Sequence, residues 1–110
     1  MANTFTRKLS QNVGTTATAI NSYTVAANTT VVVVGLTVTS KTGSSITANV
    51  FINDGAANTF ISSNAPISSG SSLVAVGGDQ KLVLITGDKV FVQSSASSSI
   101  DAVLSILEIT

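Results

Sequence analysis

Cysteine, histidine and tryptophan are all absent from this 110-residue chain. Without cysteine there is no disulfide framework and no thiolate zinc site. Without histidine the commonest general base is missing, and a Ser-His-Asp triad cannot be built. The same two absences remove the usual nitrogen and sulfur ligands of transition metals. We therefore expect a protein that is not an enzyme and that binds no cofactor.

Charge is also scarce. Charged residues make up 9% of the chain, and five basic residues balance five acidic ones, whereas an average soluble domain has about 25% charged residues. Nucleic-acid binding would need a clustered basic face, but Arg7 and Lys8 are the only adjacent basic pair. No apolar run approaches the roughly 20 residues that cross a bilayer as a helix. We expect neither nucleic acid nor a membrane as a partner.

The acidic residues are spread along the chain. Asp54, Asp79 and Asp88 each stand beside a glycine, where aspartate favours a turn because its side chain accepts hydrogen bonds from backbone amides. Asp101 and Glu108 are seven residues apart, so a strand would place them on opposite faces. A glycosidase or a calcium site needs carboxylates that converge. We therefore interpret these acids as turn and surface residues, not as catalytic residues or metal ligands.

The chain is rich in short apolar runs, which are separated by Gly, Asn, Asp and Ser. This pattern predicts one all-β domain, a two-sheet antiparallel β-sandwich of the jelly-roll or immunoglobulin-like type with about eight strands. Asn53, Asp54 and Gly55 predict a tight hairpin turn. The segment 62–72 contains the only proline, Pro66, and is expected to be an irregular connection. Strands are expected at 4–10, around 23–25, and at 29–40, 45–53, 59–62, 73–76, 81–85, 89–94 and 100–109.

Side-chain alternation predicts which faces of two strands point to the core. The even positions of 29–40 should face inward: Val32, Val34, Leu36 and Val38. The inward face of 45–53 should carry Ile46, Ala48, Val50 and Ile52. Phe51 falls on the opposite face, where we expect a loop or a neighbouring subunit to cover it.

Several short motifs resemble a known group of proteins. From about residue 13 to the end, the chain is similar to small structural proteins of tailed-bacteriophage virions, including phages of cyanobacteria. The matching segments are NVGT (12–15), YTVA (23–26), NAPI (64–67), GSSL (70–73), GDQKLVL (78–84), TGDKV (86–90) and LSILEI (104–109).

This resemblance implies a non-enzymatic component located in the virion. The implied partners are the major capsid protein or other virion proteins, together with further copies of the chain in a trimer or ring. A capsid decoration (cement) protein that bridges capsid subunits is the leading expectation, and a neck, collar, tail or baseplate subunit is the alternative. The scarcity of charge agrees with a subunit of an assembly, because neutral hydroxyl groups are cheaper to bury than ions.

The N-terminal segment is the expected point of contact. We divide the chain into an N-terminal strand or arm, 1–12, and a sandwich, 13–110. An edge strand can extend a neighbour's sheet, so the candidate assembly contacts are Phe5, Arg7, Lys8 and Leu9. Deleting residues 1–12 should leave a folded domain that no longer joins the particle.

A function of a different class is a glycan-binding module, which a small jelly roll can also support. Such modules commonly stack sugars on exposed Trp or Tyr side chains. This chain has no Trp and a single tyrosine, Tyr23, so the composition favours assembly over glycan binding.

Overall fold

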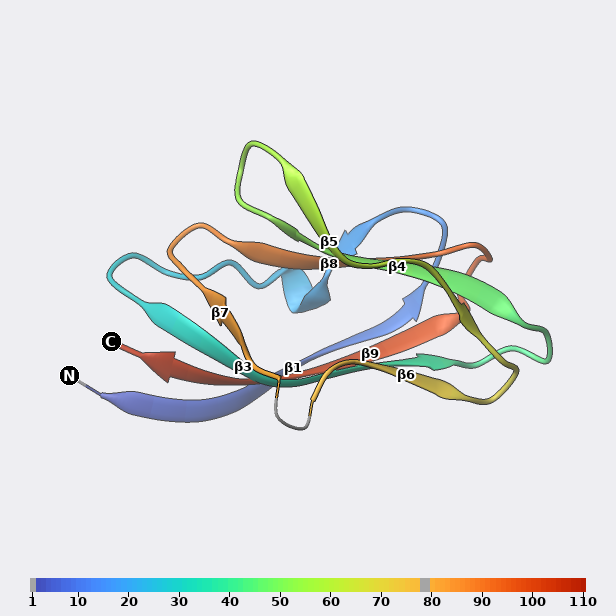
Figure 1. Cartoon of the computed structure of the whole chain (residues 1–110), viewed down its shortest axis with the longest axis horizontal. Helices are drawn as coiled ribbons and strands as arrows, with labels where there is room; N and C mark the ends of the chain where they lie inside the picture. Colours follow the sequence, from blue (N-terminus) through green and yellow to red (C-terminus); the bar gives the residue numbers. More distant parts are fainter. Residues whose placement is uncertain (1, 78–79) are drawn as a thin grey trace.

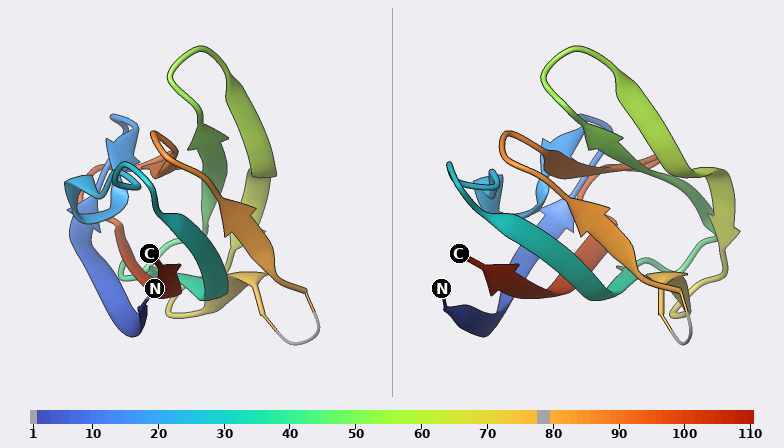
Figure 2. Two further views of the ribbon diagram at one scale, coloured as in Figure 1. Left: turned by 90° about the vertical axis from the view of Figure 1, so that its left-hand side faces the viewer. Right: turned by 60° about the vertical axis from the view of Figure 1, so that its left-hand side comes forward.

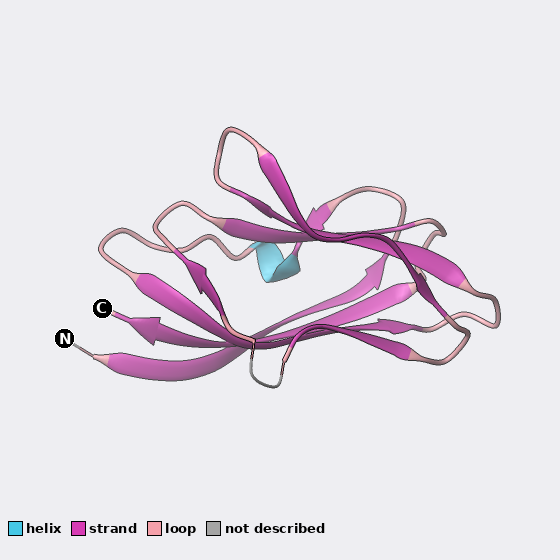
Figure 3. Ribbon diagram, viewed as in Figure 1, coloured by secondary structure: helices cyan, strands magenta, loops and turns pink. Residues whose placement is uncertain are grey.

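The computed structural model describes residues 2–77 and 80–110, which fold into strands with one short helical turn (Figure 3). No helix in these residues is long and apolar enough to cross a membrane. The nine strands of the described chain confirm the all-β prediction. They are β1 (Asn3–Val13), β2 (Thr18–Ala19), β3 (Thr30–Ser40), β4 (Ile46–Asn53), β5 (Asn58–Ile67), β6 (Ser72–Val76), β7 (Leu82–Leu84), β8 (Lys89–Ser94) and β9 (Ile100–Ile109), with the 3₁₀ turn η1 (Ile20–Ser22).

The strands form two facing antiparallel sheets (Figure 1). The first sheet has the order β1-β9-β3-β6, and β7 also pairs with β3. The second sheet has the order β2-β8-β4-β5. The predicted two-sheet sandwich is therefore confirmed, and the core lies between the two layers.

The strand pairing is nested. Strand β1 pairs with β9, β2 with β8, β3 with both β6 and β7, and β4 with β5, all antiparallel. The chain therefore forms one long hairpin whose turn is the β4–β5 loop. Successive strand pairs along this hairpin belong to alternate sheets. This is the connectivity of a jelly roll, which decides between the two sandwich types expected from the sequence.

Strand β3 differs from the predicted alternation in its first half. Val31 and Val33 are fully buried, whereas Val34 is 38% exposed. The register of β3 against β9 shifts between Val33 and Gly35, so one extra residue reverses which side chains point inward. The prediction is correct for the later even positions but wrong for Val32 and Val34.

Strand β5 replaces much of the irregular connection expected at 62–72. It continues through Pro66 to Ile67. Because β5 is the edge strand of the second sheet, the missing N–H of Pro66 removes no hydrogen bond from the middle of a ladder. The β4–β5 hairpin was predicted correctly, with Asn53 opposite Asn58, and its turn projects beyond the rest of the sandwich (Figure 2).

The stretch around 23–25 is not a strand. Instead, β2 and η1 precede it, and Val25 exchanges backbone hydrogen bonds with Gly87 and Asp88. Val25 is nevertheless buried in the core. The apolar residue was thus placed correctly, but its local conformation was not.

The core contains apolar side chains from both sheets. As predicted, Ile46, Ala48 and Val50 point inward from β4, and Ile52 packs against the edge of the core. Complete burial of one aliphatic side chain contributes about 1.5–3 kcal/mol. Every buried apolar side chain of the described residues lies at Val13 or later, so residues 2–12 add none to the core.

Candidate assembly surface

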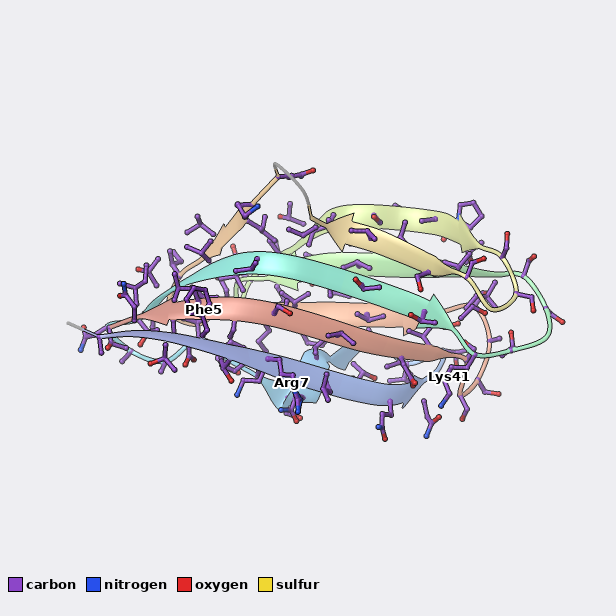
Figure 4. All side chains as sticks on the ribbon, turned by 90° about the horizontal axis from the view of Figure 1, so that it is seen from below. Phe5, Arg7 and Lys41 are labelled. Carbon is purple, nitrogen blue, oxygen red and sulfur yellow. The ribbon has the colours of Figure 1, made fainter. Side chains whose placement is uncertain are left out.

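Strand β1 forms one edge of the first sheet, and its side chains alternate as expected. Phe5 is 76% exposed and Leu9 is 40% exposed on the outward face, with Arg7 exposed between them. Figure 4 looks onto this face from below and labels Phe5 and Arg7. Three of the four candidate contact residues therefore lie together on one solvent-facing surface.

Strands from distant parts of the sequence extend this surface. Across the sheet, Leu9 is opposite Val103 of β9, which is opposite Thr37 of β3, which is in turn opposite Val74 of β6. We define the outer patch as the exposed apolar side chains on the outward face of the first sheet: Phe5, Leu9, Val34, Val74, Val83 and Val103.

A shallow depression lies within the outer patch. Phe5, Arg7, Val34 and Ser105 are among the residues that line it. The register explains the hollow, because Ser105 stands between Arg7 and Gly35 and neither Ser nor Gly has a side chain large enough to fill the space. Within residues 2–77 and 80–110, the structure shows no ion pair to Arg7.

Lys8 points the other way. Its Nζ atom lies 4.9 Å from the centre of the Tyr23 ring, and the Tyr23 hydroxyl donates a 2.5 Å hydrogen bond to Glu108. Burial and the Glu108 carboxylate raise the pKa of Tyr23. The structure thus separates Lys8 from the other three candidate contacts and places it against the inner side of the sheet.

Two of the three turn aspartates, Asp54 and Asp88, have the local roles expected of them. Asp54 accepts hydrogen bonds from the N–H groups of Ala57 and Ala56, which lower its pKa, and Asp88 accepts one from the N–H of Ile85. Asp79 lies outside the described residues. In the part of the chain that is described, no three His, Cys, Asp or Glu side chains gather in a way that could hold a metal ion.

The outward face of the second sheet carries an aromatic ladder. Phe51 stacks on Phe91 with ring centres 5.4 Å apart and contacts Phe60 at 5.0 Å. Phe51 is 5% exposed, so its cover comes from neighbouring strands of the same chain. The expectation of a covering loop or subunit was wrong, because two cross-strand phenylalanines, Phe60 and Phe91, cover the Phe51 ring.

No protein-family model matches the chain, and no curated protein matches it significantly. Among solved structures, it is similar to a chain of Bacillus endospore appendages, described as disulfide-linked pili. That match has 15% identity and a TM-score of 0.55, and it covers 100% of this chain and 91% of the other. These values show a shared fold.

A second similar structure is a chain of the T13 IBDV viral particle. It has 14% identity and a TM-score of 0.58. The match covers 96% of this chain but only 30% of the viral one, so this chain spans about a third of that protein's length. At these identities, both matches show the fold alone.

Proposed function

We propose that the protein is a non-enzymatic structural subunit of a virus particle and that it joins its neighbours through the outer patch. The observation that carries this proposal is the exposure of Phe5, Leu9 and Val103 on one face. When one face of an antiparallel sheet covers the core, the other face is usually polar. Exposed apolar side chains gathered on one face instead point to an interaction site.

The fold supports this proposal without deciding it. Jelly rolls occur in viral capsid proteins, in lectins and in cupins, and a shared fold does not establish a shared function. The likeness to a chain of the IBDV particle favours the first of these classes. Low charge across the whole chain agrees with a surface that is covered in an assembly.

Within the particle, a capsid decoration (cement) protein of a tailed bacteriophage fits best. Such a subunit would bridge copies of the major capsid protein as a trimer or ring. The described chain measures 45 × 28 × 21 Å, and its outer patch lies on one broad face, which suits a protein laid on a lattice. A neck, collar, tail or baseplate ring is the alternative position, and copy number separates the two.

The N-terminal arm, 1–12, is proposed as a second element of the contact. Its described residues, 2–12, contribute no buried apolar side chain to the core, although β1 pairs with β9 from Asn3 onward. A chain that lacks residues 1–12 should therefore fold, as judged by far-UV circular dichroism, but fail to join particles. If the shortened chain joined them as well as the full chain does, the arm would have no role in assembly.

Paired substitutions test the outer patch. A chain with Phe5→Ser and Leu9→Thr should bind particles that lack the protein at least tenfold more weakly, because exposed aromatic anchors dominate many interfaces. The matched control is Phe60→Ser, since Phe60 is 50% exposed on the second sheet. Equal binding by the two variants, measured by co-sedimentation, would refute the use of the outer patch.

Two other functions have less support. The Bacillus appendages are disulfide-linked pili, and a chain without cysteine cannot form such links. Glycan stacking needs free ring faces, but Phe51 and Phe91 face one another and Lys8 lies over the Tyr23 ring. The exposed rings of Phe5 and Phe60 belong to different sheets, so they do not form one stacking platform. A glycan array with clear hits would restore the second of these functions.

A further inference from the structure

Three side chains from separate segments meet at one end of the first sheet. The Nζ atom of Lys41, just after β3, lies 2.5 Å from Oδ1 of Asn12 near the end of β1. The same Nζ atom lies 3.3 Å from Oδ1 of Asp101 on β9. Figure 4 labels Lys41 at the end of the sheet that is opposite the chain termini.

The backbone holds these groups in place. Oδ1 of Asp101 also accepts a 3.1 Å hydrogen bond from the N–H of Asn12, and the N–H of Lys41 donates to Ser99 at 2.8 Å. Asn12 has a φ of 57° at the point where the register of β1 against β9 shifts. The bulge therefore turns the Asn12 carboxamide toward Lys41.

The cluster adds a carboxamide to a surface ion pair whose Lys41 and Asp101 side chains are 37% and 38% exposed. It joins a nucleophilic amine, a carboxamide that can be attacked, and a carboxylate that can carry a proton. Holding an amine and an amide in contact within one chain speeds their reaction, with effective concentrations that reach about 10⁵–10⁸ M when the reacting atoms are aligned.

We propose that Lys41 and Asn12 form an intramolecular isopeptide bond after folding. The neutral amine of Lys41 attacks Cγ of Asn12, and a C–N bond forms while the carbonyl electron pair moves to Oδ1. Asp101 accepts a proton from Nζ and passes it to Nδ2 of Asn12. The Cγ–Nδ2 bond then breaks, ammonia leaves, and the carbonyl re-forms as a secondary amide.

The reaction is balanced within the chain. One amine and one primary amide become one secondary amide and one ammonia molecule, so no oxidant or further reactant takes part. Only the neutral amine attacks, and Asp101 is the charged group that faces it. The rate should therefore rise with pH, because base converts more of the amine to its neutral form.

The bond would anchor the base of the N-terminal arm. It joins residue 12, at the boundary of the arm, to the segment that follows β3, while the preceding residues of β1 stay outside the crosslink. The first strand could then pair with a neighbour without its base leaving the sandwich. This inference rests on the three side chains alone and does not depend on the proposed virion function.

Mass spectrometry of the full chain tests the proposal. After incubation at pH 9, the intact protein should be lighter by one ammonia molecule. Trypsin normally cleaves after Lys8 and Lys41, but a modified Lys41 is not cleaved, and the next lysine is Lys81. Peptide 9–41 should therefore be replaced by a looped peptide, 9–81, that is also lighter by one ammonia molecule.

A control separates this bond from succinimide formation, which also releases ammonia from asparagine. Lys41→Arg keeps a positive charge beside Asp101 but removes the amine nucleophile, so this variant should keep its full mass. Asp101→Asn should form the bond at least tenfold more slowly, because a positioned acid–base group commonly contributes 10²-fold or more. An unchanged wild-type mass at pH 9, or the same loss in Lys41→Arg, would overturn the proposal.

Discussion

The reversal of inward and outward side chains within β3 can be tested by alanine substitution. Val33 is fully buried and Val34 is 38% exposed. Val33→Ala removes two methyl groups, at about 0.8 kcal/mol each, and leaves a cavity that raises the cost to about 2–3 kcal/mol. Val34→Ala should cost less than about 1 kcal/mol, since its side chain is already partly in solvent.

These differences are large enough to measure in a domain of this size. A loss of about 2–3 kcal/mol lowers the melting temperature by roughly 10 °C, and Val34→Ala should lower it by only a few degrees. Urea unfolding followed by far-UV circular dichroism gives the free energies directly, and the chain has no Trp to report by fluorescence.

Val38→Ala is the matched control, because Val38 is fully buried on the part of β3 where the strict alternation also predicted an inward side chain. It should resemble Val33→Ala. The placement of the bulge would be refuted if Val34→Ala proved more costly than Val33→Ala, because the simple even-position pattern predicts that order.

Two further predictions concern ionisable side chains. The pKa of Tyr23 is raised above its usual 10.0, so its contribution to stability is complete below pH 10 and is lost as pH rises further. In urea unfolding from pH 9 to 11, the free energy of unfolding should therefore fall less steeply with pH in Tyr23→Phe than in the wild type. An equal fall in the two proteins would contradict the raised pKa of Tyr23. The pKa of Asp54 is lowered from 3.8, so the amide proton shifts of Ala56 and Ala57 should titrate with a midpoint below pH 3.8. Asp54→Asn should abolish that titration, and a midpoint at or above 3.8 would count against the hydrogen bonds.

Features that depend on local sequence were predicted well. The bounds of β8 and β9 are those expected from their apolar runs, and the turn at Asp54 was placed correctly because its residues favour that geometry on their own. The alternation of Phe5 and Leu9 likewise placed both side chains on one face, since β1 has no register shift until after Ser10.

Features that depend on distant strands were not predictable from local pattern. The bulge near Val34 is defined by pairing with β9, and tolerance of Pro66 depends on β5 being an edge strand. The outer patch joins Phe5 to Val74 and Val83, which belong to strands far along the chain. No local signal connects such residues before the strand order is known.

The central claim is that this chain is a structural part of a virus particle. Mass spectrometry of purified particles, with copy number measured against the major capsid protein, tests it most directly. The account predicts hundreds of copies per particle, as expected for a decoration protein on the head, whereas a few to a few tens would place the chain in a neck or tail ring. Absence of the chain from clean particles would contradict the virion function altogether.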